Sequence, residues 1–180
     1  MTSPYRLSAG YLNDHLAAAT AAARRACRTA EALLDADARP PLRRLAAELE
    51  GDLASLRRVM RELDVPERQS AVWLARGGEL LGLLKPNGSL WHRTPLTDLV
   101  ELEALRLAVL GKRQLWTALS GHHGLGCRLD RQRLTELVAR ADHQAETLEE
   151  LRLRAARTVG RVAVGPGLPG GWATRPARRR

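Results

Sequence analysis

The sequence predicts an all-α protein folded as a four-helix bundle. Apolar residues recur every three or four positions in four long stretches of the 180-residue chain, which is the spacing of one face of an amphipathic helix. Breaks that contain proline or glycine separate these stretches. No stretch shows the strict alternation of apolar and polar residues that is typical of a half-buried β-strand.

The first two helices are expected at residues 8–34 and 42–63, with a proline-containing break at 36–41 between them. Their apolar stripes are Leu12, Leu16, Ala19, Ala23, Ala26, Ala30 and Leu33, and then Leu42, Leu45, Leu49, Leu53, Leu56, Met60 and Leu63. The first stripe keeps a 4-3-4-3 spacing, which indicates knobs-into-holes packing against a neighbour. Cys27 is expected to pack near this seam as an ordinary small residue.

The other two long helices are expected at 95–120 and 130–159, with Thr94 and Asp130 as their N-caps. The helix over 95–120 is apolar on almost every side, which predicts a central helix buried all round. We expect Gly111, within it, to permit the close approach of a neighbouring helix.

About 30 residues connect the second and third long helices, and they include a short apolar helix at 70–84 interrupted by Gly77 and Gly78. A four-helix bundle with one long crossover in the middle is the ferritin-like arrangement. We therefore expect a ferritin-like bundle over residues 1–159. Glycine, proline and arginine dominate residues 160–180, which predicts a disordered tail.

The basic character of the chain is confined to its C-terminal end. The net charge is +9, but residues 151–180 hold eight of the 29 basic residues and no acidic ones. The first 150 residues therefore carry 21 basic against 20 acidic groups and are nearly neutral. Only the C-terminal end is expected to attract phosphates.

We expect a cytoplasmic protein. Cys27 and Cys127 lie a hundred positions apart without a paired motif, which suits a reducing compartment better than a disulfide scaffold. The N-terminal residues show no basic region followed by an apolar core, so no secretory signal is predicted. The chain also has no uncharged apolar stretch long enough to span a membrane.

Several polar residues lie on or beside the apolar stripes, and Glu103 on the most apolar helix is the most informative of them. A buried carboxylate must find a partner, change its pKa or bind a metal. The preferred interpretation is a buried hydrogen-bond network that fixes helix register. Its expected members are His15, Glu103, Gln114, Gln144, Arg106 and Arg152.

A metal site is the alternative interpretation. Its candidate ligands are His15, Glu48, Asp52 and Glu103, which suit iron, manganese or zinc. Ferritin-like di-iron sites take a Glu-x-x-His motif from each of two helices, and this sequence has none. His122, His123 and Cys127 offer zinc-type donors but lack a fourth ligand, so we expect a simple turn there.

A nucleic-acid interface at the C-terminal end is the third possibility. Its candidate residues are Arg152, Arg154, Arg157, Arg161, Arg178, Arg179 and Arg180. Such a patch would attract phosphates without sequence preference. Trp172 is the only aromatic residue in the tail, so a base-stacking surface is missing and a solvated tail is preferred.

Four motifs carry a family resemblance: YLNDHL at 11–16, acidic residues midway along the second helix, the ELEALRL…GK..LW run at 101–116, and the glutamine in the fourth helix. On these motifs, residues 8–158 resemble uncharacterised actinobacterial proteins with a ferritin-like four-helix bundle. The resemblance implies the fold but no activity, because the usual metal ligands are not matched.

The sequence therefore favours a non-enzymatic helical bundle that acts by self-association or by binding a protein partner, with no cofactor and no membrane contact. It offers neither a nucleophile elbow nor a phosphate-binding loop. The two alternatives are a ferritin-like metal-binding protein, with iron or manganese in a redox or storage role, and a nucleic-acid-associated protein.

Overall fold

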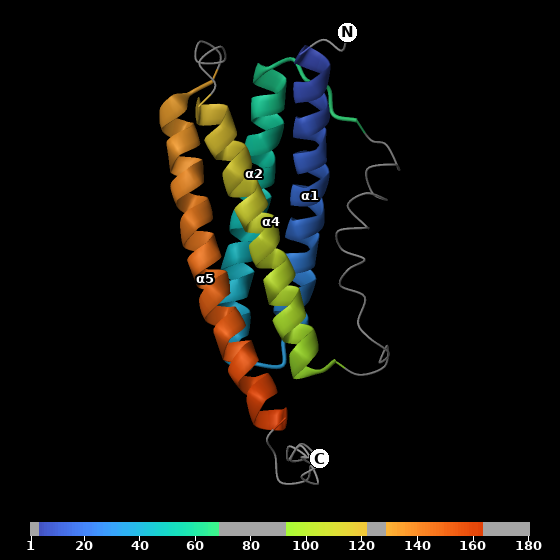
Figure 1. Ribbon diagram of the computed structural model, residues 1–180, viewed down its shortest axis with the longest axis vertical. Helices are drawn as coiled ribbons and strands as arrows, with labels where there is room; N and C mark the ends of the chain where they lie inside the picture. Colours follow the sequence, from blue (N-terminus) through green and yellow to red (C-terminus); the bar gives the residue numbers. More distant parts are fainter. Residues whose placement is uncertain (1–3, 69–92, 122–128, 164–180) are drawn as a thin grey trace, which may run out of the picture.

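The structure is a computed structural model that describes residues 4–68, 93–121 and 129–163. In this part of the chain four long α-helices lie side by side, and no strand is present (Figure 1). The helices are α1 (Pro4–Ala32), α2 (Arg39–Glu62), α4 (Pro95–Gly121) and α5 (Arg131–Ala163), with a short 3-10 turn, η1 (Ala36–Ala38), between the first two. The prediction of an all-α helical bundle is confirmed.

Contacts between helix ends fix the directions of the helices. The backbone N–H of Arg68, just after α2, donates to Asn13 Oδ1 near the start of α1 at 2.7 Å. Thr29 near the end of α1 donates to Glu101 near the start of α4 at 3.0 Å. Helices α2 and α4 therefore both run opposite to α1 and parallel to each other, and α5 returns alongside α4 (Figure 1).

The bundle consists of two helical hairpins. The most extensive packing lies within the pairs α1/α2 and α4/α5. The hairpins meet mainly where α4 packs on α1, while α2 and α5 touch only over a short length. The expected crossover with its short helix at 70–84 falls within residues 69–92, outside the described residues.

The core is built almost entirely from leucine and alanine. The predicted stripes of the first two helices are buried, except that Ala19 is only partly covered. Trp116 on α4 is the largest fully buried side chain of the described core. The prediction for Cys27 is wrong, because it is exposed. It follows the buried Ala26 by one residue, about 100° around the helix, and therefore faces solvent.

Both predicted N-caps of the second hairpin are confirmed. Asp130 Oδ1 accepts from the backbone N–H groups of Gln132 at 3.0 Å and Arg133 at 3.2 Å. Thr94 Oγ1 accepts from the backbone N–H of Thr97 at 3.3 Å. The last helix continues to Ala163, four residues beyond the end expected at about 159. Residues 164–180 lie outside the described part.

Helix α4 is not buried all round, contrary to the prediction. One of its faces is open, and Leu96 and Leu107 on it are 56% and 66% exposed. Gly111 does not mediate a close approach either, since a Cβ atom built on it would meet nothing within 4 Å. Each helix of a four-helix bundle keeps an outward side, even when that side carries leucine. None of the described helices is both long and apolar enough to cross a membrane.

Candidate functional site

Three polar side chains meet in the middle of the bundle, one each from α2, α4 and α5. Asp52, Lys112 and Gln144 are all buried. The Lys112 ammonium donates to the Asp52 carboxylate and, at 2.5 Å, to Gln144 Oε1. Gln144 Nε2 donates in turn to Asp52 Oδ2 at 3.1 Å. The three groups therefore close a triangle of hydrogen bonds that links three helices.

The helical periodicity places each of the three side chains in the core. Every one of them has an apolar residue three positions before it and another four positions after it, which is the spacing of one buried helix face. The flanking residues are Leu49 and Leu56 for Asp52, Val109 and Trp116 for Lys112, and Ala141 and Leu148 for Gln144.

Two exposed residues complete this cluster at its edge. Arg140 Nη2 lies 2.5 Å from Asp52 Oδ1. Glu48 Oε2 accepts from Gln144 Nε2 at 3.0 Å. The cluster of Glu48, Asp52, Lys112, Arg140 and Gln144, which we call the central cluster, thus contains two cations and two anions. Buried charges are tolerated when they are paired in this way.

Burial has the largest single effect on the pKa of Lys112. Removal from water lowers its pKa below the usual lysine value, and the Asp52 carboxylate opposes part of that effect. Arg140 also lowers the pKa, whereas Glu48 raises it. The ammonium is therefore held in the core by its partners, and losing Asp52 would leave it with the Gln144 amide, the Arg140 cation and the exposed Glu48 carboxylate.

The central cluster is suited to fixing register rather than to acid–base chemistry. Asp52 contacts two cations, Lys112 and Arg140, and Lys112 is hydrogen-bonded to Asp52 and Gln144. A general base or nucleophile needs a free lone pair within reach of a substrate. The groups of this cluster are instead committed to one another.

The predicted network and this cluster overlap only in part. Gln144 lies in the central cluster, and so do Glu48 and Asp52, which were candidate metal ligands. Lys112 was not predicted, although it follows Val109 by three residues on the same helix. A lone lysine at that spacing in such an apolar helix is the signal that could have identified it.

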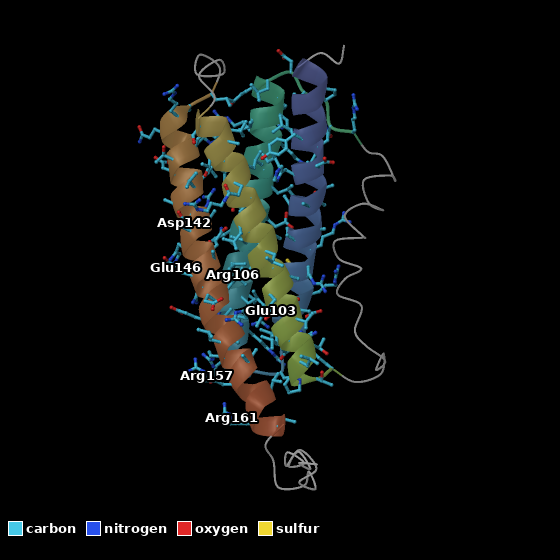
Figure 2. The ribbon with its side chains drawn as sticks, viewed as in Figure 1. Glu103, Arg106, Asp142, Glu146, Arg157 and Arg161 are labelled. Atoms are coloured by element: carbon cyan, nitrogen blue, oxygen red, sulfur yellow. The ribbon has the colours of Figure 1, made fainter. Side chains whose placement is uncertain are left out.

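Glu103 lies on the surface, so its predicted burial is wrong. Its side chain is 44% exposed and Oε1 is 3.6 Å from Arg152 Nη1. Arg152 also pairs with Glu149 at 2.7 Å, and Arg106 lies 3.1 Å from the same carboxylate. These residues form a separate ion-pair group between α4 and α5 (Figure 2). Gln114 is exposed and belongs to neither cluster.

His15 does not join the predicted partners either. It packs edge-on against Tyr11, with ring centroids 4.5 Å apart. Burial lowers the pKa of His15, and the neighbouring Asp14 carboxylate opposes part of the shift. The imidazole is therefore kept neutral beside the ring rather than paired with Glu103.

The four candidate metal ligands are not brought together as a set, since Glu48 and Asp52 lie in the central cluster and His15 and Glu103 do not. Across the described ranges, no group of three histidine, cysteine, aspartate or glutamate side chains is placed to hold a metal ion. Asp52 is engaged by Lys112 and Arg140, and Glu103 is part of the surface group with Arg152. The donors expected for iron or manganese thus face different partners. His122, His123 and Cys127 lie outside the described residues.

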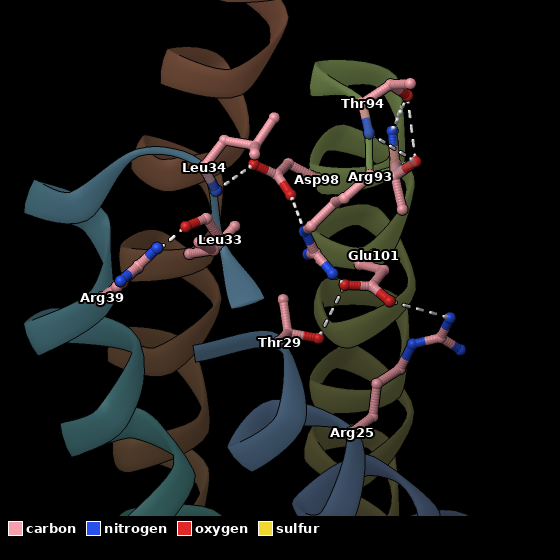
Figure 3. Close-up of polar contacts among 10 residues, drawn as sticks. Arg25, Thr29, Leu33, Leu34, Arg39, Arg93, Thr94, Asp98 and Glu101 are labelled. Atoms are coloured by element: carbon pink, nitrogen blue, oxygen red, sulfur yellow. Dashed lines mark hydrogen bonds and ion pairs between the residues drawn. The ribbon is translucent and has the colours of Figure 1, made fainter. Parts of the chain in front are cut away.

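A second set of polar contacts ties the end of α1 to the start of α4 (Figure 3). Asp98, which is buried, accepts from the backbone N–H of Leu34 at 2.9 Å and pairs with Arg93 at 2.5 Å. Arg93 also pairs with Glu101 at 2.5 Å, and Arg25 reaches the same carboxylate at 4.0 Å. These contacts fix how α4 enters the bundle.

The arginines near the end of α5 differ in their partners. Arg154 pairs with Asp35 at 2.8 Å, and Arg152 belongs to the surface group described above. Arg157 donates to the Leu153 carbonyl at 3.2 Å. Arg157 and Arg161 project from the last turns of the helix (Figure 2). The candidate residues Arg178, Arg179 and Arg180 lie outside the described residues.

No protein-family model matches the chain, and no curated protein or solved structure is similar to it.

Proposed function

We propose that this protein is a non-enzymatic helical bundle that associates with a second copy of itself through the open face of α4. The observation that carries the proposal is the pair of exposed leucines on that face, Leu96 and Leu107. They are 11 residues apart, which brings them to almost the same side of the helix, about 16 Å from each other along its axis.

The position and charge of this face support the proposal. Helix α4 lies at the front of the bundle in Figure 1, with no other described helix over it. Val100 on the same face is only half-buried. The first 150 residues are nearly neutral, so two copies would meet little electrostatic repulsion. Exposed apolar side chains grouped on one face are typical of an interaction surface.

Sedimentation equilibrium of the full chain tests this function. We expect a concentration-dependent dimer, and we expect the Leu96→Lys, Leu107→Lys double variant to be a monomer with unchanged helix content. Leu153→Lys is the matched control, because Leu153 is also exposed but lies on α5. A strict monomer for the unaltered chain at high concentration would refute self-association. Association only with an added protein would instead favour a partner of another kind.

We further propose that the topology is ferritin-like and that the protein works in the cytoplasm. The parallel directions of α2 and α4 support the first statement, because a connection between parallel neighbours must return along the bundle. The two cysteines without a paired motif support the second.

A nucleic-acid role through the C-terminal end is the second candidate. It is supported by Arg157 and Arg161, which make no ion pair with a carboxylate among the described residues. DNA binding should then weaken steeply with salt, and Arg157→Gln with Arg161→Gln should reduce the salt slope by about two. An unchanged slope would remove these arginines from the interface.

A further inference from the structure

A groove of about 450 Å³ runs between α1 and α4. Small residues on both helices line the groove, and their short side chains leave it open. They are Ala17, Ala18, Ala21 and Ala22 on α1 and Gly111 on α4. Open space lies above Gly111, where an added Cβ atom would meet nothing within 4 Å. On α1 the groove extends from Asp14 to Arg25, about 16 Å of helix. The cavity is therefore long, narrow and mostly apolar.

Three buried polar atoms on the wall of this groove make no hydrogen bond in the described part of the chain: Asp52 Oδ1, which Arg140 pairs with, and two donors. Trp116 lines it at one end, and its buried indole N–H has no hydrogen-bond partner in the described part of the chain. Arg25 lines the other end, and its buried Nε–H also has none there. The nearest carboxylate to Arg25, that of Glu101, lies 4.0 Å away and is already bound by Arg93 and Thr29.

Lys112 and Asp52 also reach the groove, but they neutralise each other. A buried donor without a partner is costly, because it has lost its bond to water without gaining another. A molecule that entered the groove and offered an acceptor oxygen would remove that cost. A carboxylate at Arg25 would do so with a charge-assisted hydrogen bond, which is stronger than a neutral one.

We propose that the groove between α1 and α4 binds an anionic amphiphile, with its carboxylate at Arg25 and its apolar chain along the alanines of α1. A fatty acid has this chemistry: one acidic head and a chain narrow enough to lie between two helices. Ligand sites of this kind are apolar clefts with few polar groups that set the orientation of the ligand. The proposal goes beyond self-association. Leu107 lines the groove and also belongs to the open face of α4, whereas Leu96 lies outside the groove, so the two sites share one side chain.

Isothermal titration of the full chain with myristate, kept below the concentration at which it forms micelles, tests the proposal. We expect saturable binding close to one molecule per chain. Gly111→Leu should fill the groove and weaken binding at least about tenfold. Because glycine is a poor helix former and the site is open, this variant should fold at least as well as the unaltered chain.

Gly51→Leu is the matched control. Gly51 is also a helical glycine with nothing within 4 Å of an added Cβ, but it lies on α2 outside the groove. Its affinity for myristate should be unchanged. Arg25→Gln should lower the affinity for myristate about tenfold while leaving that for myristyl alcohol the same.

Three results would overturn the proposal. One is the absence of saturable binding to a folded chain, which would mean that the groove is filled by another part of the protein. The second is equal binding by Gly111→Leu and the unaltered chain, which would place the ligand elsewhere. The third is that the unaltered chain does not bind myristate and that Gly111→Leu abolishes its dimer. That result would mean that a second copy of the chain occupies the groove.

Discussion

Replacing Asp52 by leucine should destabilise the protein strongly. The change removes the carboxylate that holds the Lys112 ammonium and leaves it buried with Gln144 and near Arg140. Removing one partner of a buried ion pair costs about 3–5 kcal/mol. Domains unfold with a total of only about 5–15 kcal/mol, so a large part of the stability would be lost.

Lys112→Met should cost less than Asp52→Leu, because Asp52 keeps Arg140 and the Gln144 amide as partners. We expect about 1–3 kcal/mol for the lost hydrogen bonds. The double variant should recover most of the loss, since an apolar pair can replace a buried ion pair without penalty. About 1–3 kcal/mol should remain, because the buried Gln144 Oε1 loses the Lys112 donor. The two changes are therefore expected to be far from additive.

Urea unfolding followed by circular dichroism measures these differences, with the midpoint and slope fitted for each variant. Glu50→Leu on the same helix is the control, because Glu50 is exposed, and it should change stability by no more than about 0.5 kcal/mol. A loss below about 1 kcal/mol for Asp52→Leu, or additive effects in the double variant, would refute the reasoning that the central cluster is a coupled, desolvated pair.

Three further predictions concern the other polar groups. Glu103→Leu should change the free energy of unfolding, measured in urea, by about 1 kcal/mol or less, because its pair with Arg152 is half-exposed. A loss as large as that expected for a core residue would contradict the surface position of Glu103. Asp98→Ala should cost about 2–4 kcal/mol in the same assay, since it leaves the Leu34 N–H without its acceptor, and a neutral result would mean that water replaces the carboxylate. Burial lowers the pKa of His15 from 6.5, so the unfolded chain binds the proton more tightly and stability should rise with pH through the range just below 6.5. His15→Gln should flatten that rise, and identical pH profiles for the two chains would contradict it.

The helices could be predicted from the sequence because three of them have one clearly apolar face. On α2 and α5, Asp52 and Gln144 were singled out as polar residues on or beside that face, and both are buried. Their ionic partner was not identified. A stripe tells which residues face inward, but it does not tell which helix lies opposite.

Helix α4 shows why the rest could not be predicted. It carries leucine on both sides, so periodicity does not decide which face is inside. Glu103 and Lys112 are nine residues apart, which places them on opposite faces. Glu103 and Gln114 were correctly placed on a common face, but that face is the outer one. Because Glu103 was taken as the buried charge of α4, Lys112 on the opposite face was not recognised as buried.

The composition of the core gives the central cluster a consequence for the alignment of the helices. A core made of leucine and alanine offers many nearly equivalent ways to slide one helix along another by a turn of about 5.4 Å. In each of these misaligned states Lys112 would lose its acceptors from α2 and α5 and remain a buried, unpaired ion. The cluster therefore acts chiefly by raising the energy of the wrong alignments, so that a chain with a repetitive interior has one lowest state.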